Sequence, residues 1–207
     1  MAKLPEPPPA ADLARTAPDW QDLPAGTTLW RLYFRGGKHP TFWNSFRTFG
    51  PLSGRFDPHV PPPGAQERAI LYAAGRGPTC LAEVFQDMRV IDRGARDPWL
   101  AGFTLQSSLR LLDLTGSWPT RAGASMAINS GPRPRAQIWS RAIYEAYPEG
   151  QGCHYASSMY RNLPTVALYE RALPALPPAP VFHRPLSDPA LLPVLKRVAR
   201  DLGYGLV

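Results

Sequence analysis

The chain has 207 residues, of which 44% are hydrophobic and six are Trp, so it can form one globular core rather than a disordered chain. No apolar run reaches the roughly 18 residues of a membrane span, and the N-terminus lacks the apolar stretch of a secretion signal, so we expect a cytoplasmic protein. The formal net charge is +7, but the basic residues do not cluster, which argues against a specific nucleic-acid site.

Proline dominates two stretches of the chain. Residues 1–26 contain EPPPA, TAPD and LPAG and hold few apolar anchors apart from Trp20. Because proline fixes φ and lacks a backbone N–H donor, we expect an irregular arm here rather than a helix or strand. Residues 172–189 are also rich in proline. We expect them to lie extended over the body of a single domain that spans residues 27–207.

Elsewhere, signals for strands and helices alternate along the chain. Gly203 is a plausible stop for the last helix, and GRGP at residues 75–78 marks a turn between a strand and a helix. Because the strand and helix signals follow one another at irregular spacing, we predict an α+β fold with a small split or bent sheet flanked by helices. In chain order, the patterns predict strand 28–34, strand 68–74, helix 78–88, one or two strands in 102–113, helix 134–146, strands 153–157 and 165–169, and helix 191–202.

The two cysteines, Cys80 and Cys153, are each isolated in the sequence. Neither belongs to a CxxC pair and no His lies at finger-like spacing, so we expect no metal site. Cys80 is expected to be a small core residue on helix 78–88.

Two arginines lie in contexts that suit an anionic ligand. Arg31, in LWRLYF, lies inside an apolar strand pattern, where a guanidinium needs a partner or an anion. Arg55, in SGRFDP, follows Gly54, which allows the backbone to approach a ligand closely. Guanidinium groups match phosphate oxygens in a two-point geometry, so the pair is a candidate pyrophosphate site. The alternative is a pair of surface arginines.

Glu83 lies in the segment ILYAAGRGPTCLAEVF, together with Tyr72. On helix 78–88, Glu83 projects about 150° away from the predicted apolar stripe, which makes a solvated carboxylate the ordinary interpretation. Tyr72 lies in a predicted strand, where an aromatic residue is normally part of the core. The stripe itself is formed by Leu81, Val84, Phe85 and Met88.

Ser157 lies in GCHYASSMY, beside the alternative Ser158. His154 stands at odd spacing from Ser157 in the same predicted strand and therefore faces the other side of the sheet. No Ser-His-Asp arrangement activates either hydroxyl, so a nucleophilic role is not expected. His154 and His39 are expected to be structural or to lie at the surface.

In this order and with these apolar flanks, the segments around Arg31, Arg55, Tyr72, Glu83 and Ser157 resemble the RES family, named for its Arg, Glu and Ser. The resemblance runs from about residue 29 to residue 171. Members of this family are the toxins of bacterial toxin–antitoxin pairs and are similar in fold to ADP-ribosyltransferases that cleave NAD. The resemblance therefore implies an ADP-ribosyltransferase-like split sheet.

The resemblance also implies a role for each residue, with NAD as the substrate and no metal. Glu83 would stabilise an oxocarbenium-like ribose, because nicotinamide is already a good leaving group and needs no acid. Arg31 and Arg55 would line the substrate pocket, and the ring of Tyr72 would stack on the nicotinamide. Ser157 aligns with the family's Ser and would hydrogen-bond to the ribose or to Glu83.

The implied function is a toxin that cleaves NAD at the nicotinamide–ribose bond, with water or phosphate as the acceptor. The implied partner is an antitoxin with a helix-turn-helix of the Xre type, and a homodimer within the toxin–antitoxin complex is compatible with the resemblance. Two alternatives stay open: an ADP-ribosyltransferase that modifies a macromolecule, and a non-enzymatic basic module that binds nucleic acid.

Two features depart from the family pattern. The stretch between the first two arginines is long and aromatic, and its Phe42, Trp43 and Phe46 could form a lid, a partner surface or core. Asp57 stands where many relatives have Asn, and its charge could alter ligand contacts.

Overall fold

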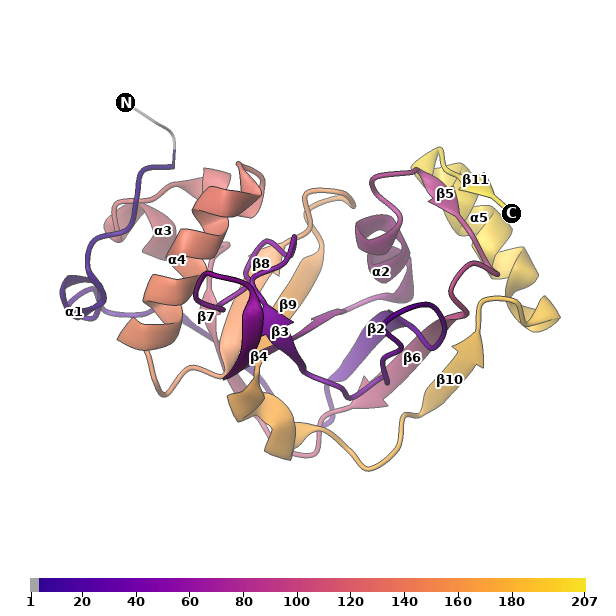
Figure 1. The fold of residues 1–207 in the computed structure, drawn as a ribbon, viewed down its shortest axis with the longest axis horizontal. Helices are drawn as coiled ribbons and strands as arrows, with labels where there is room; N and C mark the ends of the chain where they lie inside the picture. The colour runs from indigo at the N-terminus through magenta and orange to yellow at the C-terminus, as the bar shows by residue number, and fades with distance from the viewer. Residues whose placement is uncertain (1–3) are drawn as a thin grey trace.

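A nine-stranded mixed sheet runs through the molecule (Figure 1). The computed structural model describes residues 4–207. The strands of this sheet are β1 (Trp20–Leu23), β2 (Thr28–Phe34), β3 (Arg47–Gly50), β4 (Gly64–Ala74), β6 (Pro98–Thr104), β7 (Leu109–Asp113), β8 (Gly152–Ala156), β9 (Pro164–Tyr169) and β10 (Phe182–Pro185). A separate parallel pair is formed by β5 (Val90–Ile91) and β11 (Gly205–Leu206).

Helices lie over both halves of the sheet, and short 3₁₀ turns join them to the strands (Figure 1). Among residues 4–207, no helix is long and apolar enough to cross a membrane. The helices are α1 (Ala10–Leu13), α2 (Gly77–Val84), α3 (Trp118–Arg121), α4 (Arg133–Ala146) and α5 (Leu192–Leu202), and the 3₁₀ turns are η1 (Met126–Asn129), η2 (Glu170–Ala175) and η3 (Pro189–Leu191).

The sheet splits between β2 and β4. Its strand order is β1-β7-β8-β9-β4-β2-β6-β10, with β3 also paired to β4. The strands β2 and β4 share one residue pair, Trp30 with Ala74, whereas β4 pairs with β9 over five positions. Beyond that pair the two strands diverge, and the free edge of β4 is taken by β3. The expected α+β fold with a split sheet flanked by helices is confirmed, but the sheet is large rather than small, because it has nine strands.

Three apolar clusters hold the two halves together. One joins α4 to the half of the sheet that contains β7, β8 and β9, around the buried Trp118 and Trp139. A second covers the opposite face of the sheet, around Phe103 and Leu168. The third joins α2 and α5 to β2 and β6. As a result, α4 and α2 stand over different halves of the same sheet, with β8 and β9 between them in the view of Figure 1.

Most predicted elements are present, but their limits differ. Strand 28–34 coincides with β2, and the region 102–113 contains parts of two strands, β6 and β7. Residues 172–189 are not extended throughout, because the 3₁₀ turns η2 and η3 lie partly within them. The expected extended conformation is present in β10, which pairs with β6. Cys80 is 5% exposed on α2, and burial raises the pKa of its thiol to about 12, so the prediction of a core residue is confirmed.

The N-terminal stretch is more ordered than its prolines suggest. The expectation of no helix or strand in residues 1–26 is wrong for α1 and β1, and residues 1–3 lie outside the described residues. Strand β1 pairs with β7, and the ring of Trp20 packs edge-on against Tyr147 at 6.0 Å between centroids. Residues 20–23 contain no proline, so tertiary pairing can order them despite their neighbours.

Helix α2 is shorter than predicted, and its apolar face is only partly the predicted one. It ends at Val84 rather than near Met88. Of the predicted stripe, Leu81 and Phe85 are buried, whereas Val84 and Met88 are 38% and 79% exposed, so the prediction is wrong for these two. Cys80, Leu81 and Phe85 pack into the cluster shared with α5 and β2. Glu83 is therefore not on the fully solvated side, and its side chain is partly buried.

The aromatic stretch before β3 divides between core and surface. Trp43 is 7% exposed and packs on Phe103, whereas Phe42 is 61% exposed. Phe46 is partly buried against the same cluster. Of the three uses expected for these residues, core burial applies to Trp43, and Phe42 is the member left on the surface.

Candidate active site

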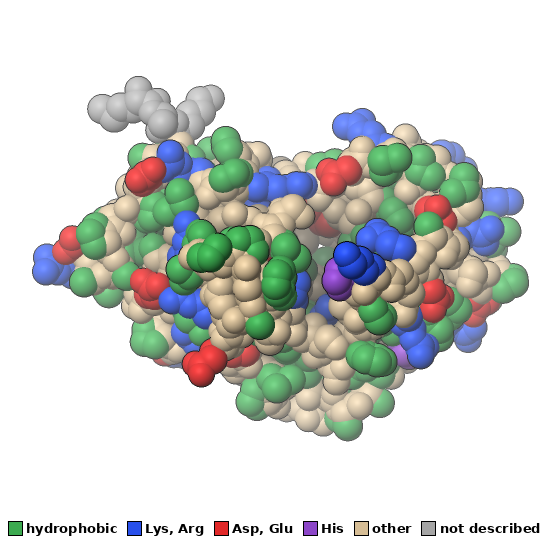
Figure 2. Space-filling model, in the orientation of Figure 1, with side chains coloured by type: hydrophobic (Ala, Val, Ile, Leu, Met, Phe, Trp, Pro, Cys, Tyr) green, Lys and Arg blue, Asp and Glu red, His purple; other side chains and the backbone are tan. Residues whose placement is uncertain are grey.

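A cavity of about 270 Å³ opens between α2 on one side and α4 with the segment 51–58 on the other. The space-filling view shows the surface hollowed between the two halves of the molecule (Figure 2). The split of the sheet leaves room for this cavity. Strands β2 and β4 share only one residue pair, and the helices α2 and α4 lie over the two diverging halves. The residues lining it are Ser53, Gly54, Arg55, Tyr72, Glu83, Val84, Gln86, Asp87, Asn129, Arg133, Tyr155 and Ser158.

Glu83 and Ser157 form a hydrogen-bonded pair at this cavity. Ser157 follows β8, is fully buried, and its Oγ donates to Glu83 Oε1 at 2.5 Å. The same Oγ accepts from the backbone N–H groups of Met159 and Tyr160 at 3.2 and 3.0 Å. Because both acceptor sites of the hydroxyl are used, its hydrogen is directed to the carboxylate. The predicted contact of Ser157 with Glu83 is confirmed, and the neighbouring Ser158 lines the cavity directly.

Two tyrosines form the floor of the cavity. Tyr72 on β4 and Tyr155 on β8 also line a smaller recess of about 60 Å³, which Glu83 shares and which is otherwise lined mostly by apolar residues. Burial raises the pKa of Tyr155, and the charge of Glu83 adds to the effect. Tyr72 lies so close to the backbone of Gly54 that a Cβ at residue 54 would be 2.5 Å from Tyr72 Oη. Glycine is therefore required there, as the sequence suggested for close approach.

Two arginines, Arg55 and Arg133, line the cavity. Arg55 Nη1 donates to the carbonyl of Gly131 at 2.5 Å, which leaves its other N–H groups available. Arg133 stands at the first position of α4, and its nearest carboxylate partner is Asp87, at 3.9 Å. Burial lowers the pKa of Arg55, and repulsion from Arg133 lowers it further. Two like charges held in one cavity favour an anionic ligand between them.

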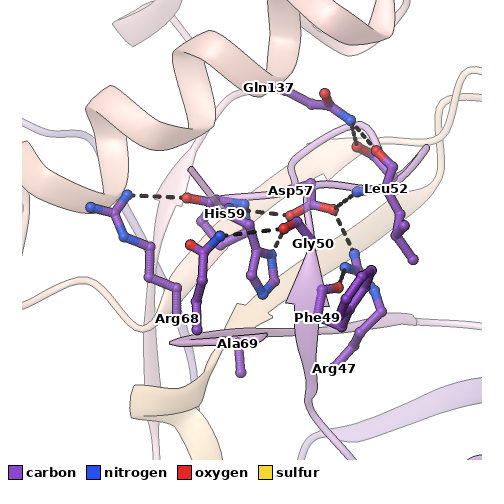
Figure 3. Close-up of polar contacts among 12 residues, drawn as sticks. Arg47, Phe49, Gly50, Leu52, Asp57, His59, Arg68, Ala69 and Gln137 are labelled. Carbon is purple, nitrogen blue, oxygen red and sulfur yellow. Dashed lines mark hydrogen bonds and ion pairs between the residues drawn. The ribbon is translucent and has the colours of Figure 1, made fainter. Parts of the chain in front are cut away.

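The segment that carries Arg55 is fixed by a buried carboxylate (Figure 3). Asp57 is fully buried, and its Oδ2 accepts from Arg47 Nη2 and from Leu52 N, both at 2.7 Å. Its Oδ1 accepts from the backbone N–H of His59 and contacts the His59 ring. Asp57 thus closes the turn on which Arg55 sits. The expectation that its charge alters ligand contacts finds no support, because Asp57 does not line the cavity.

Helix α4 holds the same segment from the other side. Gln137 Nε2 donates to the carbonyls of Leu52 and Gly54, the latter at 2.8 Å (Figure 3). Ser140 Oγ donates to the carbonyl of Phe56 at 2.8 Å. The backbone is therefore held by hydrogen bonds at Gly54 and Phe56, on either side of Arg55. These bonds fix the position from which the Arg55 side chain extends.

Within the described part of the chain, Arg31 neither lines this cavity nor hydrogen-bonds to a residue that does, whereas the buried Ser157 reaches the cavity through its hydrogen bond to Glu83. Arg31 lies on β2, and its Nη1 donates to the carbonyl of Ser45 at 2.9 Å. This carbonyl is the one hydrogen-bond partner of the Arg31 side chain among residues 4–207. Burial lowers the pKa of Arg31 to about 10. The structure thus brings together Arg55, Tyr72, Glu83 and Ser157 but places Arg31 elsewhere. A substrate contact by Arg31 stays a prediction.

Sequence reasoning missed several residues that line the cavity, and three of them bear on its chemistry. Tyr155 lies within the predicted strand 153–157, and its alternation with Cys153 and Ser157 could have indicated a shared face. Arg133 precedes the predicted helix 134–146 in the run GPRPR, where the glycine and prolines mark a helix start. Asn129 carries no local signal, because its place depends on the tertiary contact of its Nδ2 with the carbonyl of Leu114.

Comparisons with known proteins identify the family. A chain in the crystal structure of the M. tuberculosis MbcT-MbcA toxin-antitoxin complex has a similar fold, with a TM-score of 0.59 and 15% identity. The similarity covers 91% of this chain and 97% of that chain. None of the curated proteins that were compared matches the chain. A family model described as the RES domain matches residues 28–189. Because this match spans most of the sequence, the chain belongs to the RES domain family.

Proposed function

We propose that this chain is the toxin of a bacterial toxin–antitoxin pair and that it cleaves NAD at the nicotinamide–ribose bond. The observation that carries the proposal is the Glu83 carboxylate, held by Ser157 and placed in one cavity with two guanidinium groups. A fixed anion beside an anion-binding site suits a substrate that develops positive charge on a ribose next to a diphosphate.

The proposed chemistry needs little beyond Glu83. When the bond between C1′ and the nicotinamide nitrogen breaks, its electron pair leaves with nicotinamide and the ribose becomes cationic. Glu83 Oε1 is held by Ser157, so the other oxygen is free to face the ribose. An anion that is already oriented stabilises the transition state without reorganising, which is the most effective form of electrostatic catalysis.

We assign the nicotinamide ring to the recess beside Tyr72 and Tyr155. This recess is mainly apolar and shares Glu83 with the main cavity, so a ring placed there would bring its ribose to the carboxylate. The face of Tyr72 would lie against the cationic pyridinium and stabilise it by a cation–π contact. Expulsion of water from this recess would strengthen the interaction with Glu83.

We assign the diphosphate to Arg55 and Arg133. A phosphate between them would relieve the repulsion that lowers the pKa of Arg55. It would also compete with Asp87 for Arg133, whose pair at 3.9 Å is exposed and weak. We also propose that Arg31 contributes to the binding of NAD from β2.

The proposed partner is an antitoxin with a helix-turn-helix of the Xre type, and the proposed place of action is the cytoplasm. Support comes from the family and from the similar fold, which was solved in a toxin–antitoxin complex. The net charge of +7 favours an acidic segment on this partner. Such a segment could cover the cavity by contacting Arg55 or Arg133 and thereby exclude the substrate.

Incubation of the purified chain with NAD, followed by identification of every product, tests this function. Free nicotinamide with ADP-ribose indicates water as the acceptor, and ADP-ribose phosphate indicates inorganic phosphate. Label that appears on a protein or nucleic acid would instead establish an ADP-ribosyltransferase. Absence of nicotinamide release, together with salt-sensitive binding to DNA, would contradict the proposal and favour a basic binding module.

A further inference from the structure

A second cavity adjoins the candidate active site. It has a volume of about 460 Å³ and lies at the ends of β8 and β9, next to η1. Asn129 and Ser158 line both cavities, so the two cavities lie next to each other with these two residues between them. The lining residues are Thr115, Met126, Asn129, Ser130, His154, Ala156, Ser158, Asn162 and Pro164.

The imidazole of His154 is oriented so that one nitrogen remains for a ligand. Its Nδ1 lies 3.1 Å from Asp113 Oδ1, which accepts the Nδ1 hydrogen. The same oxygen of Asp113 is fixed by Thr115 N and Oγ1 at 2.9 and 2.6 Å. His154 is 9% exposed, and its Nε2 has no hydrogen-bond partner within residues 4–207. A buried ring with a fixed Nδ1 presents Nε2 as an acceptor toward the cavity that it lines.

The chemistry of the lining indicates an uncharged ligand with many polar groups. Of the described residues that line this cavity, none is Lys, Arg, Asp or Glu. Hydroxyl and amide side chains supply hydrogen bonds, and Met126 and Pro164 supply apolar surface. A nucleoside, with its hydroxyls and flat base, has this combination of groups.

The main cavity is too small for the whole of a dinucleotide. Its volume of about 270 Å³ falls below the roughly 300–1,000 Å³ of sites that bury small ligands. Its charged groups suit the diphosphate and the reacting ribose, which leaves the adenosine half without a place. The backbone from Arg133 through Gly131, whose carbonyl binds Arg55, to Asn129 leads from the main cavity to the second one.

We propose that the second cavity binds the adenosine half of NAD, with His154 Nε2 accepting a hydrogen bond from a ribose hydroxyl or from the adenine amino group. This inference rests on the proposed function. It makes His154 and its orienting partner Asp113 determinants of substrate selection, so that the enzyme distinguishes NAD from nicotinamide mononucleotide, which lacks the adenosine half.

Two substitutions of His154 separate its two nitrogens. His154→Asn places an amide near Nδ1 and keeps the contact with Asp113, but it removes the Nε2 atom. His154→Gln places an amide near Nε2 and restores a hydrogen-bonding group there. We expect His154→Asn to lower kcat/KM for NAD about tenfold, the scale of one hydrogen bond, and to leave the cleavage of nicotinamide mononucleotide unchanged. His154→Gln should recover most of the loss. His39→Ala, at an exposed loop position, is the control.

An equal loss on both substrates would overturn the inference, because it would place His154 in the chemistry or in the fold rather than at the adenosine. Unchanged kcat/KM for NAD in His154→Asn would overturn it as well.

A binding measurement separates this inference from the proposed function. Adenosine monophosphate is added to the wild-type chain while the ring signals of His154 are followed by NMR, and its affinity for the wild type and for His154→Asn is measured by calorimetry. Saturable shifts in the wild type, with weaker binding in the variant, support the site whether or not NAD is cleaved. Cleavage of NAD without any response of His154 to the nucleotide would leave the proposed function intact and reject the adenosine site.

Discussion

At the scale of single residues, Ser157 decides how Glu83 presents its charge. The serine hydroxyl receives two backbone N–H groups and gives its hydrogen to one carboxylate oxygen, so the carboxylate cannot rotate freely. A hydroxyl used in this way positions the anion and takes no part in bond formation. The role differs from that of an activated serine nucleophile, which needs an adjacent base.

Removal of the Ser157 hydroxyl should therefore lower kcat more than it changes KM. We expect Ser157→Ala to reduce kcat for NAD about 10- to 100-fold, because a hydrogen bond to a charged group contributes roughly 1.5–3 kcal/mol. Initial rates of nicotinamide release, measured over a range of NAD concentrations, give both kcat and KM. A large rise in KM at constant kcat would show that Ser157 binds substrate and does not position Glu83.

Arg55 and Arg133 should contribute to binding by two-point contacts. We expect Arg55→Ala and Arg133→Ala each to weaken NAD binding about tenfold or more, and Lys replacements to restore binding only in part, because an ammonium cannot form the planar fork. Calorimetry in a Glu83→Gln background measures affinity without turnover. Arg197→Ala, on the exposed side of α5, is the matched control. Full affinity in both variants would move the diphosphate elsewhere.

Arg31 requires its own measurement, because it lies outside the lining of the main cavity. If Arg31 contacts NAD, Arg31→Ala should weaken the binding of NAD by an amount similar to Arg55→Ala. If its role is to hold the Ser45 carbonyl, the variant should instead lose thermal stability and retain its affinity for NAD. Thermal unfolding measured alongside calorimetry distinguishes the two results, and the second would contradict the predicted substrate contact.

At the scale of elements, the segment 51–58 and helix α4 form one unit around Arg55. The segment has no regular structure of its own, so its shape depends on the Asp57 network and on the donor of Gln137 (Figure 3). Ser140, which donates to the carbonyl of Phe56, supports it as well. Catalytic geometry on a loop requires support of this kind from rigid elements.

Loss of the Gln137 amide should loosen this segment without unfolding α4. We expect Gln137→Ala to lower kcat/KM for NAD about threefold to tenfold, since each hydrogen bond contributes roughly 0.5–1.5 kcal/mol. Gln137→Glu should lower it further, because a carboxylate cannot donate and would face two carbonyl oxygens. Circular dichroism would confirm that the helix is intact. Activity equal to the wild type in both variants would contradict the supporting role.

The sequence predicts elements well where local rules apply. Strand β2 follows from its alternation, and α5 ends at Gly203 in the left-handed conformation that glycine favours. The apolar face of α2 could not be predicted in this way, because an eight-residue helix is placed by the residues around it. The sequence predicts the burial of Cys80 but not the exposure of Val84, which depends on the contacts that α2 makes with α5 and β2.

At the scale of the whole molecule, the split sheet produces the site. Helix α2 carries Glu83 on one half, and α4 with the segment 51–58 carries the guanidinium groups on the other. The family resemblance anticipated four of the clustered residues. Arg133 and Asn129 could not be anticipated, because they reach the cavity only when η1 and α4 fold against the other half.

The Asp57 network links stability to pH. Burial alone would raise the pKa of Asp57, but hydrogen bonds from Leu52, His59 and Arg47 outweigh burial and lower it below its ordinary value of 3.8. A lowered pKa means that the unfolded chain binds the proton more readily. This contribution to stability is therefore complete above about pH 4 and is lost as the pH falls through the folded-state value.

Asp57→Asn should remove this dependence. At pH 7 we expect the variant to be less stable by about 1–3 kcal/mol, the scale of an unsatisfied buried hydrogen-bonding group. Urea unfolding of both proteins at several pH values should show the difference shrinking below pH 4. A difference that stays constant down to pH 2 would contradict the link between the Asp57 charge and stability.

The central claim is that Glu83 stabilises the ribosyl cation during cleavage of NAD. The most direct test compares the rate of nicotinamide release by the wild type, Glu83→Gln and the control Glu67→Gln, whose side chain is exposed on β4. We expect Glu83→Gln to bind NAD but to release nicotinamide about 10²–10³ times more slowly, while Glu67→Gln matches the wild type. A folded Glu83→Gln protein that consumes NAD at the wild-type rate would contradict the central claim.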